Sequence, residues 1–290
     1  MATIRQLRQR RKVAQNIQQI TKAMKMVAAA RLKRAQDRVT AARPYAATMR
    51  EMMASLSRAV GGDVQHPLLA SRAPQNIGFL VVTSDRGLAG SYNSAILRRA
   101  MDLLRTYDKS RIRLYVAGRK GIQFFRRRGY NVVEEFTLGN TGVSFEEARR
   151  ITRTVWSDFE AEKIDRVVLV YTKFLSAISQ RPTEVQLLPI EPPPADETAA
   201  PEVEDEYIFE PSADVLLGAL LPRYVEGQVY QALLESIASE HGARMTAMSS
   251  ATDNAAKMIG TLTLFINRAR QAGITREISE IVGGAEALKG

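Results

Sequence analysis

Ser84–Ser91, which reads SDRGLAGS, is the only stretch of this sequence that resembles a ligand-binding loop. It follows an apolar stretch with strand character and precedes a predicted helix, a place where glycine-rich loops often hold phosphate groups on backbone N–H groups. However, the segment has neither the Gly-Lys-Ser/Thr ending of a phosphate loop nor the G-x-G-x-x-G pattern of dinucleotide-binding proteins. We therefore expect a tight strand-to-helix turn, with nucleotide binding at this loop as the alternative.

Few other residues could carry nucleophilic or metal chemistry. The chain contains no cysteine, which excludes disulfides, thiolate metal sites and cysteine nucleophiles, and only two histidines, His66 and His241. Neither histidine is close in sequence to Ser84 or Ser91, so the sequence shows no serine–histidine pair. We expect both histidines to be structural, and we predict no catalytic residue, no metal site and no cofactor.

The segments around this loop alternate between strand and helix patterns. The predicted strands are 76–85, 111–118, 130–136, a segment that begins at 165, and 183–190, and the predicted helices are 93–107, 119–128 and 144–164. Ser144 followed by Glu147 is a capping box at the start of the third helix. This order predicts a doubly wound, Rossmann-like α/β/α domain of three layers. Because only a short turn precedes the last strand, we expect it to pair antiparallel with the fourth.

A long helix is predicted from Pro222 to Gly284, because proline suits a first helical turn and Gly283-Gly284 is a stop signal. Two apolar stripes with alternating spacings of three and four run along it. The first is Met245, Met248, Thr252, Ala255, Ile259, Leu262, Ile266 and Ala269, and the second is Met248, Ala251, Ala255, Met258, Leu262, Phe265, Ala269 and Ala272. A two-stranded coiled coil needs one stripe, so the other indicates a further contact. Close packing against another backbone is expected at Gly242, Gly260 and Gly273.

The predicted partner is a helix at the other end of the chain, from Thr3 to Val60, with Pro44 as its only breaker. Its expected seam is Ile17, Ile20, Met24 and Val27, followed by Leu32, Ala35, Val39, Ala42, Ala46, Met49, Met53, Leu56 and Val60. The spacing between the two runs is a stutter, which predicts a straighter coil near Met24–Leu32. Two long helices at opposite ends of a chain, with a folded middle between them, most simply pair antiparallel.

The organisation that follows is an α/β protein with four segments. They are an N-terminal coiled-coil helix at 1–60, the sheet domain at 76–190, an acidic proline-rich insertion at 191–210 and a C-terminal coiled-coil helix at 222–284. The insertion has a composition typical of extended or disordered loops, and we expect it to have no specific role, with electrostatic screening of the basic N-terminal helix as the alternative. No run of about 18 apolar residues occurs, so we expect no membrane span.

Positive charge is concentrated at the N-terminal end. The formal net charge is +10, and the segment through Arg43 contains twelve Lys or Arg against the single acid Asp37. Such a basic helix can bind nucleic acid, anionic lipid headgroups or an acidic protein surface. The alternative is a solvated polar face.

Several segments together resemble the gamma subunits of rotary proton-translocating ATP synthases of the bacterial type. They are ITKAMKMVAAARLKRAQ from Ile20, VTSDRGLAGSYN from Val82, GRKG from Gly118 with FFRRRGY from Phe124, LESIASEHGARMTAMSSATDNA from Leu234 and QAGITREISEIVGGAEAL from Gln271. The acidic insertion departs from the family pattern. It lacks the cysteines of chloroplast relatives, so thiol regulation is not inferred.

The resemblance implies a non-catalytic rotor subunit whose terminal helices form an antiparallel coiled coil inside a hexameric head of alpha and beta subunits. The sheet domain would sit on the ring of c subunits beside the epsilon subunit, with one copy per complex and with membrane contact only through that complex. The chain would therefore lie at the cytoplasmic face of a bacterial cell membrane and bind no nucleic acid. The resemblance also implies partner contacts at Lys22, Met24, Lys25, Arg31, Arg244, Gln271 and Thr275.

Two other functions are compatible with the residues alone. One is a basic coiled-coil scaffold that binds nucleic acid or cytoskeleton, and the other is a small enzyme that binds nucleotide on the sheet domain. Met24 also fits a packing role in the coil seam, and solvent exposure is the alternative for Gln271 and Thr275. If Met24 lies level with Gln271–Thr275, facing residues have numbers that add up to about 296.

Overall fold

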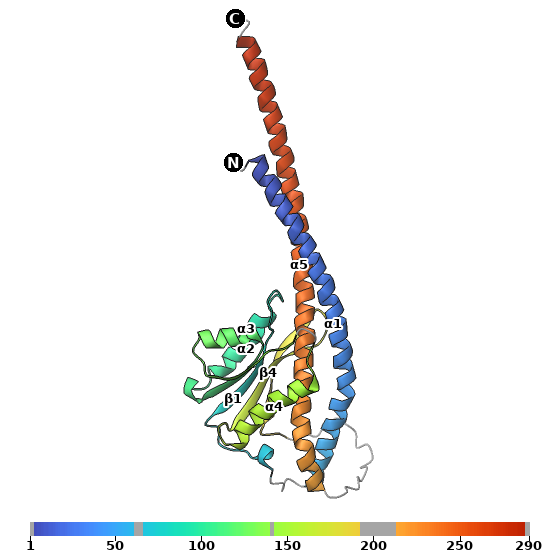
Figure 1. Ribbon diagram of the computed structural model, residues 1–290, viewed down its shortest axis with the longest axis vertical. Coiled ribbons are helices and arrows are strands. Elements are labelled where there is room, and N and C mark those ends of the chain that lie inside the picture. The colour runs from blue at the N-terminus through green and yellow to red at the C-terminus, as the bar shows by residue number, and fades with distance from the viewer. Residues whose placement is uncertain (1–2, 61–65, 140–141, 192–212, 288–290) are drawn as a thin grey trace. The chain divides into compact units, whose positions relative to one another are not determined.

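The computed structural model describes residues 3–60, 66–139, 142–191 and 213–287 (Figure 1). Apart from Glu191, the predicted acidic insertion at 191–210 therefore lies outside the described residues. Contacts divide the chain into two compact units. We call Met1–Ala29 with Arg244–Gly290 the helical unit and Ala30–Ala243 the sheet unit, and we describe each by itself.

The sheet unit contains a five-stranded sheet in the order β3-β2-β1-β4-β5. Its strands are β1 (Ile77–Val82), β2 (Ile112–Ala117), β3 (Val132–Phe136), β4 (Arg166–Phe174) and β5 (Gln180–Leu188). The first four strands pair in parallel with one another, and β5 pairs antiparallel with β4. The predicted topology is confirmed, although β5 begins three residues before the predicted start at Thr183.

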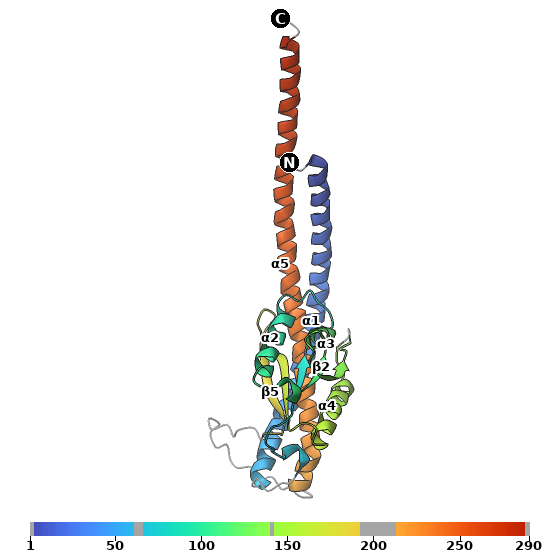
Figure 2. The same ribbon diagram turned by 90° about the vertical axis from the view of Figure 1, so that its left-hand side faces the viewer.

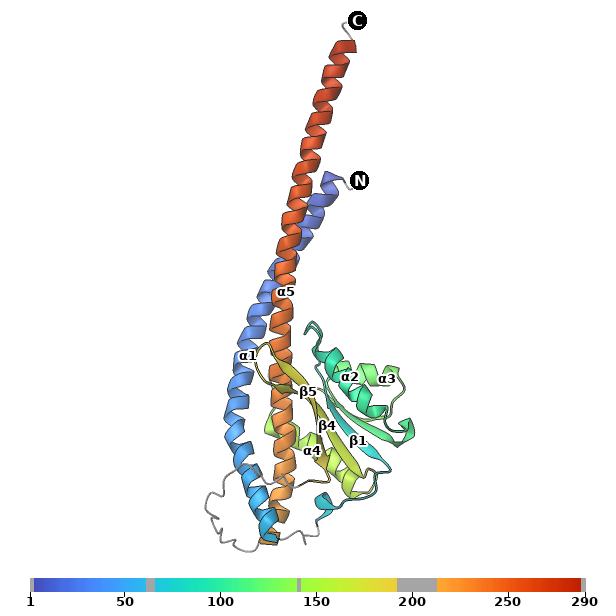
Figure 3. The same cartoon turned by 180° about the vertical axis from the view of Figure 1, so that it is seen from behind.

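Helices cover both faces of this sheet. One layer consists of α2 (Tyr92–Leu104) and α3 (Arg119–Arg127), and the other contains α4 (Phe145–Glu160) and part of α5 (Ala213–Ala287) (Figures 1 and 3). Short 3-10 turns at Pro67–Leu69 and Lys109–Arg111 lead into this framework. Every residue of β1 is buried, as expected for a central strand that is covered on both faces. The predicted capping box of Ser144 and Glu147 at the start of α4 is confirmed.

The two edges of the sheet differ from its centre. At one edge, β5 contains Pro182, which lies opposite Thr172 of β4 and has no N–H to donate to a further strand. At the other edge, the five-residue strand β3 includes Glu134, which is exposed, and Glu135, which forms an ion pair with Arg126. Both edge strands therefore contain residues that are rare in the middle of a sheet.

The two terminal helices are continuous. Helix α1 spans Ile4–Val60 and includes Pro44, and α5 spans Ala213–Ala287 and includes Pro222. The prediction that Pro222 begins the C-terminal helix is wrong, as is the prediction that Gly283-Gly284 ends it. Before Pro222, Leu217 and Leu221 are buried, and their packing offsets the cost of about 3 kcal/mol for a proline inside a helix. None of the described helices is long and apolar enough to cross a membrane.

Within the sheet unit, α5 lies between α1 and the sheet (Figure 3). Its backbone comes close to other elements at glycine. A Cβ atom at Gly227 would lie 3.7 Å from the Tyr45 ring, and one at Gly242 would lie 2.8 Å from the carbonyl oxygen of Ala177. The predicted close approach at Gly242 is thus confirmed. It is wrong for Gly260 and Gly273, where no described atom lies within 4 Å of an added Cβ.

Candidate functional site

The glycine-rich loop after β1 is held by hydrogen bonds among its own residues and α2. The Ser84 hydroxyl donates to the carbonyl oxygen of Arg86 at 2.6 Å, and the backbone N–H of Ser84 donates to the Asn93 side chain at 3.1 Å. Leu88 adopts a left-handed φ of 63° and is exposed. These bonds shape a turn between β1 and α2, as the sequence predicts.

The same loop also fixes the start of α3. The Asp85 carboxylate accepts a hydrogen bond from the N–H of Arg119 at 2.9 Å, and the Thr83 hydroxyl accepts one from Gly121 at 2.9 Å. Gly118 has a φ of 100°, and a Cβ there would lie 2.3 Å from the Thr83 carbonyl oxygen. The polar groups of this loop therefore tie β1 to α3, and we assign the loop a structural role.

In the helical unit, α1 and α5 run antiparallel side by side (Figure 2). Two polar contacts fix their register. The Thr252 hydroxyl donates to the Thr21 hydroxyl at 2.8 Å, and the Lys25 ammonium donates to the Ser249 hydroxyl at 3.0 Å. The residue numbers of these pairs add up to 273 and 274.

The predicted register, with a sum of about 296, is therefore wrong by about 23 residues, or about 34 Å along the helix. Apolar residues at heptad spacing repeat every seven positions, so the pattern alone permits many registers. The polar pairs Thr21–Thr252 and Lys25–Ser249 distinguish among them because only one alignment joins both pairs.

The seam of α1 also differs from the prediction in the helical unit. The residues that turn inward are Ala14, Thr21 and Ala28, each buried and each seven positions from the next. The predicted seam residues Ile17 and Ile20 are exposed, the latter by 59%. Val13 and Val27, which share this face of α1, are also exposed.

The stutter expected near Met24–Leu32 is absent from the described burial pattern of α1, because the residues that face α5 keep one seven-residue repeat through this stretch. Buried or half-buried residues follow an unbroken alternation of three and four from Ala28 through Leu32, Ala35 and Val39 to Met49, Met53 and Leu56. The apolar stripe with Ile17 and Ile20 lies one position before the seam, so it flanks the contact with α5. Large apolar residues are on this flank, and small or polar residues are in the seam.

The two stripes predicted for α5 separate in the way that the prediction requires. No residue of the first stripe, from Met245 to Ala269, is exposed. By contrast, Met258, Phe265 and Ala272, which belong only to the second stripe, are exposed. The first stripe is therefore the seam with α1, and the second is an apolar surface of the helical unit.

Helix α5 is also longer than its partner. With a register sum of 273, Ile4 at the start of α1 lies level with Ala269, so residues 270–287 of α5 extend about 27 Å past it (Figure 2). The extension has exposed apolar side chains at Ile274, Ile278 and Ile281, the last of them 71% exposed. Such a stripe at helical spacing is suited to a partner's apolar surface.

The structure places the seven predicted site residues in different surroundings. Lys22 is exposed and Met24 is half-buried, whereas Arg244 is buried. Arg31 is half-buried and belongs to the sheet unit. Lys25 contacts Ser249, as described above.

Gln271 and Thr275 lie on the α5 extension and are exposed. The Thr275 hydroxyl donates to the carbonyl oxygen of Gln271 at 3.0 Å, so this side chain bonds to its own helix. The register separates both residues from the level of Met24 by more than twenty positions along α5. The structure therefore does not bring the two groups of predicted contact residues together.

The polar contacts of the seam residues Thr21, Ser249 and Thr252 were not predicted from the sequence. Their signal is a short polar residue at a seam position, where an apolar one is usual. The sequence prediction placed Thr252 in an apolar stripe and assigned no hydrogen-bond partner to its hydroxyl. The arrangement of the helical unit offers contact surfaces, and its described residues include no cluster of acidic or histidine side chains suited to metal binding.

Comparisons with known proteins give a consistent picture. The family model described as ATP synthase matches residues 3–288. The ATP synthase gamma chain of Desulfitobacterium hafniense is 50% identical over 291 residues, and the alignment covers 100% of both chains. The ATP synthase gamma chain of Pelotomaculum thermopropionicum is 48% identical over 289 residues, again with 100% of both covered.

Solved structures share the fold. A chain from the central stalk and c-ring of the Tetrahymena thermophila mitochondrial ATP synthase matches with a TM-score of 0.60 and 28% identity, and the match covers 80% of this chain and 99% of that one. A chain from the Euglena gracilis mitochondrial ATP synthase matches with a TM-score of 0.68 over 98% of this chain and 94% of that one. Its identity is 18%, so it supports the fold alone.

Proposed function

This chain belongs to the family of ATP synthase gamma chains, and we propose that the exposed apolar faces of its helical unit are the surfaces through which it acts on the catalytic head. A gamma chain is a non-catalytic subunit of the central stalk, the rotor of the synthase.

The observation that carries this proposal is the α5 extension. Residues 270–287 lie beyond α1, and Ile274, Ile278 and Ile281 are exposed on them. An isolated soluble helix rarely keeps such a stripe in water, so a surrounding apolar surface is expected to cover it. A sleeve of alternating alpha and beta subunits offers that cover on every side.

The mechanism follows from a mismatch of symmetry. One asymmetric helical unit inside a threefold sleeve presents a different face to each of three catalytic sites. Each 120° step of rotation would exchange those faces and thereby change the three nucleotide affinities in turn. Proton flow through the c-ring would drive the rotation, so the chain would link the two processes mechanically.

The seven predicted site residues fit this proposal to different degrees. Lys22, Gln271 and Thr275 are exposed in the helical unit and are available for direct contact with alpha or beta subunits. Met24 and Lys25 flank or join the α1–α5 seam, so we propose that they combine packing with partner contact. Arg31 and Arg244 are more enclosed, and their proposed role is to position the exposed residues around them.

The proposed assembly contains one copy of this chain with alpha, beta and epsilon subunits and the c-ring. The exposed apolar helical faces favour the alpha and beta subunits as partners of the helical unit, and the bacterial relatives favour the cytoplasmic face of a bacterial cell membrane. There the chain would be peripheral and would be attached through the c-ring. We assign it no cofactor.

Co-purification tests the proposal directly. The tagged full-length chain is expressed with the alpha and beta subunits of the same bacterium, and we expect recovery of an ATP-hydrolysing head with one copy of this chain. A second preparation lacks residues 270–287 and should recover less of the head. Recovery of nucleic acid in place of alpha and beta would favour a basic scaffold, and tight nucleotide binding by the chain alone would favour an enzyme.

A further inference from the structure

Within the sheet unit, a stretch of α5 is enclosed on nearly all sides. From Tyr224 to Gly242, fourteen residues are buried, the other five are half-buried, and none is exposed. The interdigitated side chains of this stretch already resist rotation of the helix about its own axis. Directional bonds add to that resistance and fix the angle, and the structure shows two groups of them.

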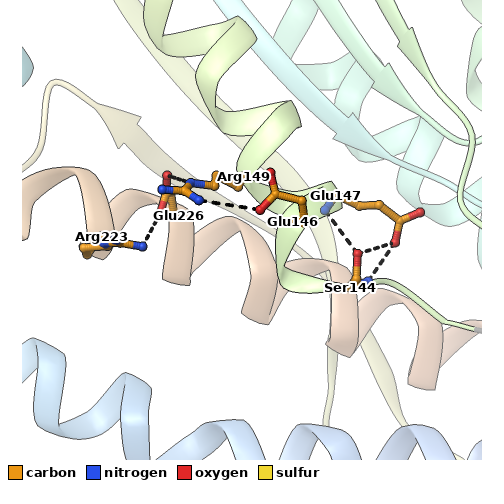
Figure 4. Close-up of polar contacts among 6 residues, drawn as sticks. All are labelled: Ser144, Glu146, Glu147, Arg149, Arg223 and Glu226. Carbon is orange, nitrogen blue, oxygen red and sulfur yellow. Dashed lines mark hydrogen bonds and ion pairs between the residues drawn. The ribbon is translucent and has the colours of Figure 1, made fainter.

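The first group joins α5 to α4 (Figure 4). The Glu226 carboxylate is on α5 and is only 3% exposed. Its Oε1 accepts a hydrogen bond from the Nε of Arg149 on α4 at 3.2 Å, and its Oε2 lies 3.6 Å from an Nη1 of Arg223. Arg149 also forms an ion pair with Glu146 at 3.5 Å.

The first turn of α4, which precedes Arg149, is itself held in place. The Ser144 hydroxyl accepts a hydrogen bond from the N–H of Glu147 at 3.2 Å, and the Glu147 carboxylate accepts one from the N–H of Ser144 at 2.7 Å (Figure 4). Phe145 packs edge-on against Tyr230 of α5, with ring centroids 5.5 Å apart. Arg149 therefore projects from a fixed helix end toward Glu226.

The second group joins α5 to the end of β4. The pairing of β4 with β1 ends at Val170, so the backbone groups of Thr172 and Phe174 lie beyond it. The Ser239 hydroxyl donates to the Thr172 carbonyl oxygen at 3.2 Å, and the Glu235 carboxylate accepts from the N–H of Phe174 at 3.3 Å. The Ser236 hydroxyl accepts from the N–H of Thr172 at 3.4 Å.

The two groups hold different sides of the same helix. At about 100° per residue, the nine positions from Glu226 to Glu235 amount to about 180° around α5 and about 13 Å along it. Bonds at two heights and on opposite sides resist a twist of the helix much better than bonds along one line.

We infer that these two groups form a torque-bearing joint, which locks α5 to the sheet domain so that rotation of one turns the other without slip. Glu226 with Arg149, and Ser236 and Ser239 with Thr172, are its positioning residues. The inference rests on the proposed function, because torque crosses this joint only if the chain is a rotor. It adds the residues that keep the rotor rigid under load.

The test uses the complete synthase reconstituted in vesicles. One variant is Glu226→Gln, a second is Ser236→Ala with Ser239→Ala, and a third combines all three changes. The matched controls are Arg150→Gln and Ser250→Ala, because both side chains are exposed on the same helices. ATP hydrolysis without a gradient is measured beside proton pumping against a gradient of increasing size.

We expect the variants to hydrolyse ATP at the normal rate without a gradient and to lose pumping at a smaller opposing gradient than the wild type. The combined variant should lose it first, and both controls should follow the wild type. If Glu226→Gln does not assemble, Arg149→Gln with Glu226→Gln replaces it, because that pair leaves no buried charge alone. Unchanged pumping by the assembled combined variant at every gradient would overturn the inference.

The wild-type synthase separates this outcome from a failure of the proposed function. If the wild-type chain does not assemble into a proton-pumping complex, the proposed function is wrong. If it does and the combined variant pumps equally well at every gradient, only the joint is wrong. A conservative variant, Glu226→Asp, adds a further check, since it keeps the charge and should recover pumping that Glu226→Gln loses.

Discussion

Helix α1 has two stretches that pack against α5 in opposite ways. In the helical unit its seam is small or polar, with Ala14, Thr21 and Ala28, while large apolar residues such as Ile20 are exposed. In the sheet unit the seam contains Leu32, Val39, Met49, Met53 and Leu56, all buried. The difference shows that one helix can stabilise its own fold along one stretch and leave its large apolar residues exposed along another; we propose that other subunits cover the exposed ones.

The sharpest test of this comparison is the register of the small, polar seam. Thr21→Cys with Thr252→Cys should form a disulfide on oxidation, because the two hydroxyl oxygens are 2.8 Å apart and the chain has no other cysteine. Met24→Cys with Gln271→Cys should not form one. Non-reducing electrophoresis before and after oxidation distinguishes the two pairs, because a disulfide within the chain closes a loop and changes the mobility of the denatured chain. The opposite result would restore the register with a sum of about 296.

A truncation in the large apolar seam should have the greatest effect on stability. Met53→Ala removes a side chain that is 2% exposed, and we expect it to lower the free energy of unfolding by about 2–5 kcal/mol. Met52→Ala is the matched control, because the Met52 side chain is 44% exposed. Urea unfolding of the full chain measures both. Equal losses for the two variants would mean that this seam does not stabilise the sheet unit.

Enlarging a residue of the small seam should cost less. Ala28→Leu adds bulk where Ala28 is buried against α5, so we expect a loss of about 1–3 kcal/mol from overpacking. Val27→Leu, at the exposed neighbouring position, should be neutral. Thermal unfolding monitored by circular dichroism compares the two. A stabilising effect of Ala28→Leu would show that the helices have room to spare there.

The two units also differ in their polar contacts, and acid should reveal this. Lys25 and Ser249 bond near solvent, whereas Asp158 in the sheet unit is buried and accepts bonds from Tyr115 at 2.6 Å and Lys163 at 2.8 Å. Burial opposes ionisation of Asp158, but the bonds from Lys163 and Tyr115 outweigh it and lower its pKa below the ordinary 3.8.

Because the folded-state pKa of Asp158 is the lower one, its stabilisation is complete above the unfolded-state pKa. It is lost as the pH falls through the folded-state pKa. We expect Asp158→Asn to cost about 1–3 kcal/mol at neutral pH and progressively less below pH 3.8. Urea unfolding at several pH values tests this. A cost that stays constant into acid would exclude the ionised carboxylate as its source.

The smallest expected effect on stability is at the exposed stripe of the helical unit. Ile17→Ala and Ile20→Ala should each change the free energy of unfolding of the isolated chain by less than about 0.5 kcal/mol. Both should nevertheless weaken recovery of alpha and beta subunits in the co-purification. Gln19→Ala, at an exposed position of the same helix, is the control. A large loss of stability from either isoleucine variant would place the stripe inside the fold of this chain.

Much of the fold follows from local patterns. Buried apolar runs such as the one around Phe79 predict the strands, and the Ser144–Glu147 capping box marks the start of α4 correctly. The start of α5 was not predictable from Pro222 alone, because the burial of Leu217 and Leu221 extends the helix past it. Tertiary packing outweighs a local breaker there.

The contact surfaces were harder to predict. Hydrophobic spacing identifies apolar stripes, but two adjacent stripes look alike until the partner helix is placed, and the seam through Ile17 and Ile20 was therefore misassigned. The register depends on hydroxyl pairs such as Thr21–Thr252, which spacing does not reveal. Ion pairs between distant residues, such as Arg149 with Glu226, have no sequence signal of their own.

The proline in β5 affects how readily the chain aggregates before it assembles with other subunits. A free sheet edge can recruit strands from other copies, which leads to aggregation. Pro182 interrupts the row of backbone N–H donors along one edge, and the exposed charge of Glu134 disfavours pairing with a further strand at the other. A newly made copy that waits for its partner subunits is thereby protected from joining others of its kind, although its apolar helical surfaces are still uncovered.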